Sequence, residues 1–468
     1  MEDKKYLYKR NNIWWVKVAV PKSQRDKFGY DLRQTTGKSD LDEARIVRDH
    51  IVESLKSKLS ESENYIPLPS TKFMEKTNIE NPQYFHKVVD CQYACPAHTN
   101  VPEYIRLIAQ KKYTDAYMLN WESNVFPGIL GRVCDRPCEP ACRRGRTHEK
   151  SVAICRLKRV TYDYKDDVEK YIPKSPKIKN GKKIALIGAG PASLTVARDL
   201  LPLGYECTIF EKDHKAGGLM RTNIPSFRLP ADVLDEEIYR IIDMGAELKL
   251  NSYIDKLKPV IDEYDSVFIG TGDPKGKDLN LKGREISSEN IHIGIDWLTS
   301  IAFEHVKKIG KKVVVIGGGN TAMDCCRSAL RLGATDVKVT VRSPFSQMKA
   351  SEWEIEETME EGIPILDNTS PKEFMFDDKG KLCGVKFEKM EQVEIDGRKK
   401  MQSTGEELTI ECDDVLLAIG QENAFPWIEK DIGIEFGEWE MPVVDKLTMQ
   451  STHPKVFFGG DSAWGPEN

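Results

Sequence analysis

The sequence predicts an α/β protein, in which parallel sheets with crossover helices follow a cysteine-rich helical region and a small strand-and-helix module. Three observations predict this class. The chain has 468 residues, enough for about three domains. Beyond residue 181, short apolar strands alternate with helical stretches, the pattern of parallel sheets with crossover helices. Two of these strands run directly into glycine-rich turns.

Composition and charge exclude several classes of protein. Charged residues make up 31% and hydrophobic residues 40% of the chain, which is not the balance of a disordered, collagenous or membrane-spanning protein. No segment approaches the ~18 to 20 consecutive apolar residues of a spanning helix, and the start lacks the apolar core of a signal peptide. The net charge of -5 does not indicate nucleic acid or an acidic surface as the main partner. We therefore expect a cytoplasmic protein with no membrane partner.

The first 62 residues form a basic module. Up to Lys58 they contain 14 basic and 9 acidic side chains. Aromatic and β-branched residues predict strands at 13–21 and 32–36. A helix should follow, with Ser39 as its N-cap and an apolar face that runs from Leu41 to Leu55.

The first glycine-rich turn follows the strand expected at 183–187. Gly188 makes the tight turn, and Gly190 lets a pyrophosphate approach the backbone at the N-terminus of the next helix. Ser193 stands where a third small residue permits close packing of helix on strand. The next strand ends at Glu211, 21 residues past Gly190, where a carboxylate receives ribose hydroxyls in dinucleotide-binding folds. Strand, glycines, helix, strand and acid in this order predict a nucleotide site.

The second glycine-rich turn differs from the first. Gly317, Gly319 and Ala322 occupy the fingerprint positions after the strand expected at 313–316. The following strand ends in Arg342 instead of an acid. A cation there can pair with a 2'-phosphate, so this site favours NADP over NAD. Two turns of different kind indicate two nucleotides, one flavin and one nicotinamide.

Six of the eleven cysteines lie within 65 residues. In a reducing compartment, clustered thiols indicate a metal site more than disulfides. Their spacing suits thiolate ligation of a four-iron cluster, and zinc is the competing metal. For the last of the six, a buried structural thiol is the alternative. The candidate metal ligands are Cys91, Cys95, Cys134, Cys138, Cys142 and Cys155.

From about Cys91 to Asn468 the chain resembles the small subunit of glutamate synthase and the N-terminal half of dihydropyrimidine dehydrogenase. The motifs that carry the resemblance include CPAHTNVPEYI, GRVCDRPCEPACRRG, IALIGAGPASL, VIGGGNTAMD and VFFGGDSAWGP. The resemblance implies two Rossmann-like domains, the second inserted in the first. In the sequence they are preceded by a helical iron-sulfur domain and by the small α+β module. The expected domains are 1–62 for that module, 75–170 for the iron-sulfur domain, 181–300 with 420–468 for a C-terminally incomplete FAD-binding domain, and 301–419 for the NAD(P)H-binding domain.

The resemblance also implies site residues. For FAD they are Gly188, Gly190, Pro191, Ala192, Glu211, Gly218, Leu219, Gly460 and Asp461. For the nicotinamide cofactor they are Gly317, Gly319, Asn320, Thr321 and Arg342. For the cluster they are Cys91, Cys95, Cys134, Cys138 and Cys142, with Cys155 as a further candidate. Relatives carry an additional Cys-x2-Cys that is absent ahead of Cys91, so we expect one [4Fe-4S] cluster, with two as the alternative.

Residues 1–60 resemble instead the N-terminal module of phage-type tyrosine recombinases, through YLYKRNNIWWVKVAVPKSQRDKFG and LRQTTGKSDLDEAR. Such a basic module can contact DNA phosphates. The alternative is a solvated basic face without a ligand. The candidate contacts are Trp14, Trp15, Lys17, Arg25 and Arg33.

These features predict an oxidoreductase that passes electrons from NADPH through FAD to a [4Fe-4S] cluster and then to a protein acceptor. The acceptor would be a large subunit or a ferredoxin-type protein. The flavin converts hydride chemistry into single-electron chemistry, so no catalytic side chain is required. The alternatives are a direct NADPH-dependent reductase of a small substrate and a DNA-binding protein with a vestigial redox half.

Overall fold

The computed structural model describes residues 6–10, 13–20, 31–36, 38–60, 89–147, 150–286, 289–395 and 398–465. The chain divides into two compact units, Met1–Val89 and Asp90–Asn468.

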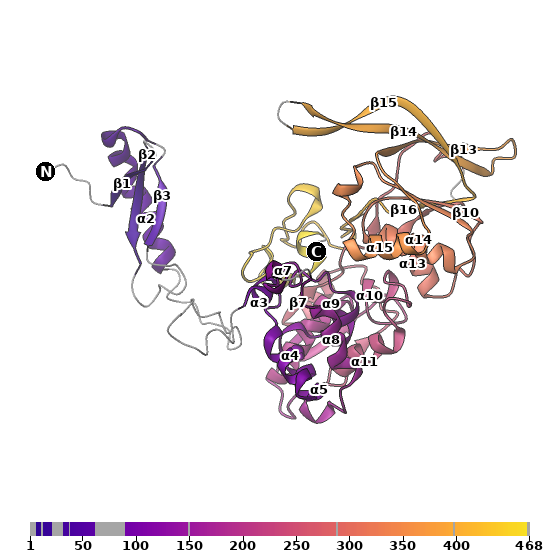
Figure 1. Ribbon diagram of the computed structural model, residues 1–468. Coiled ribbons are helices and arrows are strands. Elements are labelled where there is room, and N and C mark those ends of the chain that lie inside the picture. The colour runs from indigo at the N-terminus through magenta and orange to yellow at the C-terminus, as the bar shows by residue number, and fades with distance from the viewer. Residues whose placement is uncertain are drawn as a thin grey trace. The chain divides into compact units, whose positions relative to one another are not determined.

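The first unit is a three-stranded antiparallel sheet with one helix. Strand β2 (Ile13–Ala19) lies between β1 (Leu7–Arg10) and β3 (Asp31–Thr35), and α2 (Leu41–Ser60) follows (Figure 1). Alternate side chains of the central strand point to one face, where they meet the apolar face of the helix. This core contains Val16, Val18, Val20, Ala44, Ile51, Val52 and Leu55. The two expected strands and the helix are confirmed, and β1 was not anticipated.

The N-cap of α2 is Asp40, so the expected cap at Ser39 is wrong by one residue. The Asp40 carboxylate accepts hydrogen bonds from the N–H groups of Asp42 and Glu43, at 2.9 and 3.1 Å. These are two of the donors that the start of a helix leaves without an intrahelical partner.

The second unit begins with a helical module. Its elements are α3 (Asp90–Ala94), α4 (Val101–Ala109), α5 (Tyr113–Asn124), α6 (Pro127–Val133), α7 (Arg144–Thr147) and α8 (Ile154–Asp163). Glycine permits the close approach of two of these helices, because a Cβ at Gly131 would lie 2.6 Å from Arg159 N. The predicted helical character of this region is confirmed. No helix among the described residues has both the length and the apolar content that crossing a membrane requires.

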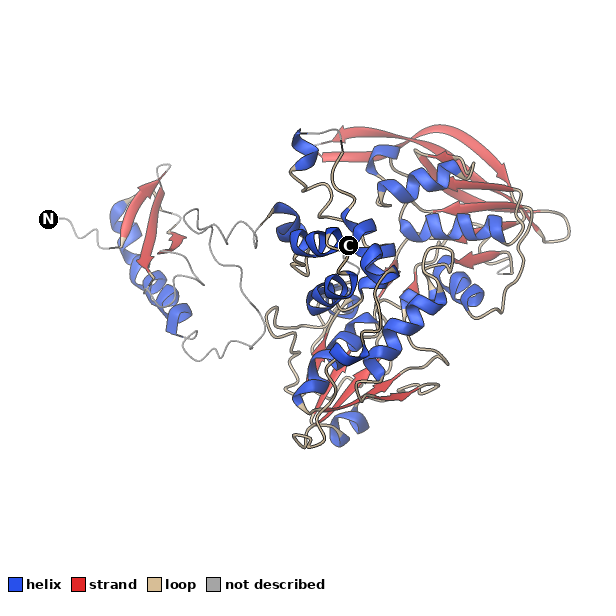
Figure 2. Cartoon of the chain, turned by 60° about the horizontal axis from the view of Figure 1, so that its bottom comes forward, coloured by secondary structure: helices blue, strands red, loops and turns tan. Residues whose placement is uncertain are grey.

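A five-stranded parallel sheet follows. Its order is β18 (Val456–Phe458), β7 (Ser266–Ile269), β4 (Lys183–Ile187), β5 (Glu206–Phe210) and β6 (Glu247–Lys249). The sequence between its strands also forms α9 (Pro191–Leu200), α10 (Leu219–Thr222), α11 (Ala231–Ile242) and α12 (Lys258–Glu263), and α16 (Asp461–Trp464) follows the last strand. Figure 2 shows the helices of the chain in blue and the strands in red. Side chains of α5 and α6 share the core of this sheet.

A second parallel sheet has the order β12 (Ile365–Leu366), β11 (Asp336–Thr340), β10 (Lys312–Ile316), β16 (Asp414–Leu417) and β9 (Ile291–Ile293). Its helices are α13 (Gly294–Ala302), α14 (Asn320–Arg331) and α15 (Glu352–Glu360). An antiparallel meander adjoins it, formed by β13 (Thr369–Phe376) and the long ribbon of β14 (Leu382–Ile395) and β15 (Arg398–Glu411), visible in Figure 1.

The second sheet is inserted in the first, as expected. The chain leaves the first sheet after β7 and returns to it at β18. Where the chain passes between the two sheets, β8 (Lys275–Gly276) pairs antiparallel with β17 (Gln421–Glu422). Strand β9 joins the second sheet ahead of residue 301, the expected start of the inserted domain. At three residues, β9 is too short to give a periodic signal in the sequence.

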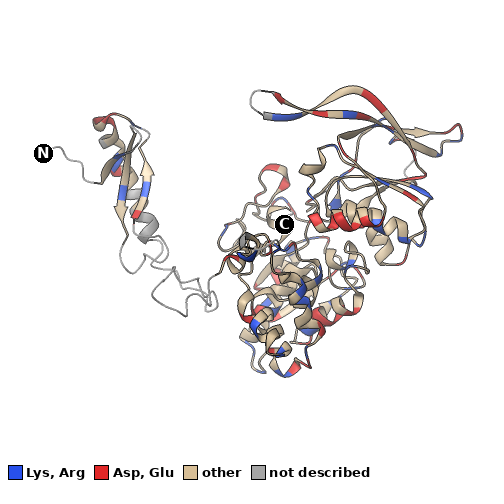
Figure 3. Ribbon diagram, viewed as in Figure 1, with Lys and Arg blue, Asp and Glu red and all other residues tan. Residues whose placement is uncertain are grey.

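Buried ion pairs join the two parallel-sheet domains. Arg228, between α10 and α11, places Nη1 2.7 Å from both carboxylate oxygens of Asp324 on α14. Its Nη2 pairs with Glu354 on the acidic helix α15, which is red in Figure 3. The three side chains are only 11, 6 and 5% exposed. Because these charges are removed from water, the loss of one of them would leave its partner buried and unpaired, which destabilises the folded protein.

Candidate functional site

The first glycine-rich turn lies at the carboxyl end of β4. Gly188 has a φ of +90°, and its N–H donates to Phe210 O at 2.8 Å. A Cβ at this position would lie 2.7 Å from Gly270 O, so only glycine fits. Helix α9 starts three residues later, and Pro191 takes its first position. The turn and the helix N-terminus thus form the arrangement that binds a pyrophosphate.

Other predicted FAD residues gather at this turn. A Cβ at Gly218 would lie 2.9 Å from Gly190 Cα, and one at Gly460 would lie 3.1 Å from Ala192 Cβ. Leu219 begins α10 directly after Gly218. The structure therefore brings together segments that the sequence separates by more than 260 residues.

The Glu211 carboxylate also lies against the turn. It is buried and accepts hydrogen bonds from the N–H groups of Ala189 and Asp213, at 2.8 and 3.1 Å. Burial raises the pKa of Glu211, and these two hydrogen bonds lower it. Its expected contact with ribose hydroxyls stays a prediction.

Four buried polar atoms near this edge have no hydrogen-bond partner within the described part of the chain. They are Ser193 Oγ, Thr271 Oγ1, Asp273 Oδ1 and Asn423 Oδ1. Native proteins pair nearly all such atoms, so this set indicates a missing polar ligand. Sequence analysis did not select any of the four as a ligand contact.

The carboxyl of Asp273, which belongs to this set, lies near the carboxyl of Asp461. Burial, and then the charge of Asp461, raise the pKa of Asp273 to about 6, and burial raises the pKa of Asp461. Asn423 also lies beside Asp461, since its Nδ2 donates to the backbone oxygen of Asp461 at 3.5 Å. Asp461 is the first residue of α16, directly after the turn that follows β18. The polar atoms of this edge suit the hydroxyls and ring atoms of a flavin nucleotide.

The second glycine-rich turn follows β10. A Cβ at Gly317, whose φ is +148°, would lie 2.1 Å from Ala418 O. At Gly319 a Cβ would meet nothing within 4 Å, so the backbone is accessible where α14 begins. The Asn320 Oδ1 accepts a hydrogen bond from Ser351 N at 2.8 Å, and the expected contact of Asn320 with the nicotinamide cofactor stays a prediction. Asn320 thus holds the start of α15, while Thr321 lies half-buried beside it.

Arg342 follows β11 and is exposed. Among the residues that the structure describes, no ion pair or hydrogen bond engages its guanidinium, in contrast to Arg327 and Arg331, which pair with Glu361. Its guanidinium is therefore open to an added phosphate.

Four of the cysteines lie near Tyr104, whose buried hydroxyl donates to Ile154 O at 3.1 Å. Burial raises the pKa of Tyr104 well above its usual value, and four cysteine thiols add to the effect. Cys138 and Cys142 belong to the same apolar cluster as this ring, and Cys91 packs against it. The thiols that act on Tyr104 are those of Cys138, Cys155, Cys91 and Cys95.

Several of the thiols lie close to one another. Burial raises the pKa of Cys138 to about 12, with Cys134 and Cys95 adding to the rise. Burial and then Cys142 raise the pKa of Cys91. In the described ranges all these thiols are free, and no three metal-binding side chains already stand at ligand spacing. As a donor set, soft thiolates fit an iron-sulfur cluster.

Cys155 differs from the other five candidates. Its Sγ donates to Leu130 O and Gly131 O at 3.3 and 3.4 Å, and its N–H donates to Glu139 Oε1 at 2.8 Å. The side chain is 2% exposed. A thiol with two carbonyl partners is typical of a packed structural cysteine, so a ligand role for Cys155 stays a prediction.

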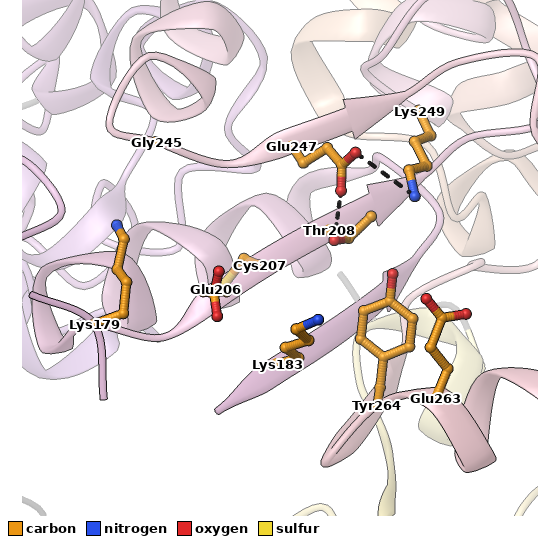
Figure 4. Close-up of a pocket in the computed structure, with 10 residues that line it drawn as sticks. All are labelled: Lys179, Lys183, Glu206, Cys207, Thr208, Gly245, Glu247, Lys249, Glu263 and Tyr264. Carbon is orange, nitrogen blue, oxygen red and sulfur yellow. Dashed lines mark hydrogen bonds and ion pairs between the residues drawn. The ribbon is translucent and has the colours of Figure 1, made fainter. Parts of the chain in front are cut away.

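A separate cavity lies at the opposite edge of the first sheet (Figure 4). It opens beside the amino ends of β4 and β5, near Lys183 and Glu206. The Glu247 carboxylate in it already accepts from Thr208 Oγ1 at 2.9 Å and pairs with Lys249 at 3.6 Å. Ligands of open parallel sheets bind at the carboxyl ends of strands, so this cavity is not the nucleotide site.

Comparison with known proteins agrees with this geometry. Residues 182–468 match the family described as pyridine nucleotide-disulphide oxidoreductase, and residues 84–170 match domain II of dihydropyrimidine dehydrogenase, described with a 4Fe-4S cluster. Two nucleotide-binding folds beside such a module define a flavin- and iron-sulfur-type oxidoreductase. The chain belongs to the pyridine nucleotide-disulphide oxidoreductase family.

Individual relatives have related names. The glutamate synthase [NADPH] small chain of Escherichia coli is 30% identical, over 81% of this chain and 84% of the relative. The NADPH-Fe(3+) oxidoreductase subunit beta of Geobacter sulfurreducens is 32% identical, over 83% of this chain. The chain spans only 63% of the length of that second relative. The structure of FprA from Mycobacterium tuberculosis with NADPH shares the fold, with a TM-score of 0.52 and 17% identity over 61% of this chain and 80% of FprA.

Proposed function

We propose that this protein takes hydride from NADPH into FAD and passes the electrons singly to a [4Fe-4S] cluster and then to a protein acceptor. The observation that carries the proposal is the union, in one compact unit, of two glycine-rich turns and the cysteine cluster. When bound, the flavin supplies the conversion of a pair of electrons into single electrons. The 4Fe-4S description of the matched module favours iron over zinc.

The chain's own residues bind and position the cofactors. The turns at Gly188 and Gly317 present helix N-termini to phosphates, and the unpartnered atoms near Asp461 hold the flavin nucleotide. Cys95 and Cys134 lie close enough to Cys138 to raise the pKa of its thiol. No side chain needs to act as an acid or base.

Anaerobic titration with NADPH tests the proposal. The flavin absorption should bleach, and the paramagnetic signal of a reduced cluster should appear in the same titration. Bleaching of the flavin without reduction of any cluster would contradict the path from flavin to cluster.

The exposed guanidinium of Arg342 supports NADP as the nicotinamide cofactor. Arg342→Ala should weaken NADPH binding roughly tenfold or more, because a hydrogen bond to a charged group contributes about 1.5–3 kcal/mol. NADH affinity should change little. Equilibrium binding of both nucleotides measures the difference, and Lys379→Ala, which removes an exposed charge at the turn between β13 and β14, is the control. Equal weakening of NADPH and NADH would contradict the preference.

The acceptor is proposed from the relatives, whose names describe a small chain and a beta subunit. We infer a partner protein that accepts single electrons, either a large subunit or a ferredoxin-type protein. A direct reductase of a small substrate would instead turn over at full rate without any protein partner, which separates the two alternatives.

A contact between residues 1–60 and DNA is a separate proposal. Lys17 and Arg33 both pair with Asp31, which reduces the positive charge that β2 and β3 offer to DNA phosphates, and Arg25 lies outside the described residues. DNA contact therefore draws its support from sequence resemblance alone.

We propose that the protein works in the cytoplasm. The free cysteines of the described chain support a reducing compartment.

A further inference from the structure

Residues 349–353 lie against the second glycine-rich turn and lead into α15, and we call them the brace. Gly318 O in the turn accepts hydrogen bonds from the N–H groups of the first two brace residues, at 3.0 and 2.9 Å. Asn320, the first residue of α14, accepts a third from Ser351 N through its Oδ1, at 2.8 Å. These hydrogen bonds fix the brace to the turn whose backbone is placed to bind a pyrophosphate.

The brace also contacts the loop between Cys134 and Cys138. Ser351 is the N-cap of α15, but within this fully described helix no N–H group donates to its hydroxyl. The hydroxyl donates instead to Asp135 Oδ1, at 2.6 Å. An N-cap side chain normally accepts a hydrogen bond from its own helix. The Ser351 hydroxyl therefore serves the cysteine loop in place of the helix.

Arg136 makes a second contact between the loop and the brace. Its guanidinium lies 4.2 Å from the centre of the Trp353 ring, a cation–π contact. Its N–H donates to Cys134 Sγ at 3.4 Å. The φ of Arg136 is +56°, a conformation that a residue other than glycine keeps only where its surroundings impose it. The brace therefore helps to hold the backbone that donates to a candidate cluster ligand.

We propose that the brace couples the two cofactor sites, so that a nucleotide at the second glycine-rich turn and a cluster at the cysteine loop each favour the binding of the other. This inference rests on the proposed function. A nucleotide held at the start of α14 fixes the turn, and the hydrogen bonds of the brace extend this order through Ser351 to Asp135. A cluster fixes the same loop from its other side. Such a coupling is reciprocal by thermodynamic necessity. Ser351 is a positioning residue, and no bond forms or breaks at its hydroxyl.

The test is equilibrium binding of 2'-phospho-ADP-ribose to full-length protein. This fragment of NADP keeps the pyrophosphate but has no nicotinamide ring, so it cannot exchange hydride. ADP-ribose replaces it if the wild type prefers a nucleotide without the 2'-phosphate. Removal of the cluster by Cys138→Ser should weaken binding at least about fivefold, the lower end of the usual coupling between sites. In the background of Ser351→Ala, the same cysteine change should leave the affinity unaltered, and the four proteins form a cycle that isolates the coupling.

Ser300→Ala is the matched control, because the Ser300 hydroxyl donates to Asp296 O within α13, at 2.9 Å. In this background Cys138→Ser should keep its full effect. Asp135→Ala breaks the same hydrogen bond from the loop side and should also abolish the effect, so it decides the question if Ser351→Ala does not fold.

The cycle separates coupling from a merely structural role. A structural Ser351 would change the affinity by itself and leave the effect of Cys138→Ser intact, and that result overturns the inference. An affinity that Cys138→Ser does not change in the wild-type background overturns it as well. A wild-type protein that holds no iron, or that binds neither nucleotide fragment, would refute the proposed function itself, which distinguishes that failure from this one.

Discussion

Replacing Cys138 with serine should remove the iron-sulfur cluster and leave the flavin in place. Cys138 is 6% exposed, and Cys134 and Cys95 are the thiols that act on it most strongly. A serine hydroxyl is a poor ligand for a metal that selects soft thiolates. The unpartnered polar atoms assigned to the flavin come from other elements. Iron should therefore fall to background while the flavin content stays at the wild-type value, as measured by metal analysis and absorption.

The same variant separates the two halves of the electron path. NADPH should still bleach the flavin of Cys138→Ser, but electron transfer to a protein acceptor should fall to background. Cys412→Ser is the matched control, because Cys412 is a buried thiol that packs against the second parallel sheet. Full iron content in Cys138→Ser, or equal iron loss in Cys412→Ser, would contradict the assignment.

Arg228→Met should destabilise the protein by about 3–5 kcal/mol, the usual effect of removing one partner from a buried ion pair. Asp324 loses its paired guanidinium, and Glu354 keeps, among the described residues, its ion pair with Arg327 at 3.1 Å. Burial raises the pKa of Asp324 and Arg228 lowers it, so the variant should raise this pKa further. A carboxyl with a raised native pKa loses stability as pH rises. The destabilisation should therefore be smaller at pH 5 than at pH 8.

Denaturant unfolding at the two pH values measures this effect. Lys312→Met is the control, since its pair with Glu411 is 47 and 75% exposed and should contribute less than about 1 kcal/mol. Similar losses in the two variants, or a pH-independent loss in Arg228→Met, would contradict a buried junction between the domains.

Features encoded by a local pattern were predictable from the sequence. Gly188 and Gly317 each follow an apolar strand and precede a helix, and both have the positive φ that such turns require. The cap of α2 was misplaced by one residue because Ser39 and Asp40 are both good N-caps, and only the backbone geometry selects Asp40.

Features that depend on distant segments were not predictable. Arg228 meets partners 96 and 126 residues away, and no local pattern announces such a pairing. Asp273 and Asn423 come together with Asp461 only when the strands of the first sheet and the β8–β17 crossing are assembled. Lys158 and Arg159 are adjacent basic residues in the sequence, and only packing shows that one is buried and the other exposed.

The central claim is that one chain holds a flavin and a thiolate-bound iron-sulfur cluster. It is tested most directly by iron, sulfide and zinc analysis of anaerobically purified protein together with its absorption spectrum. The account predicts flavin bands with about four irons and matching sulfide per chain, the content of one [4Fe-4S] cluster. Stoichiometric zinc in place of iron, or protein without flavin bands after reconstitution, would contradict it.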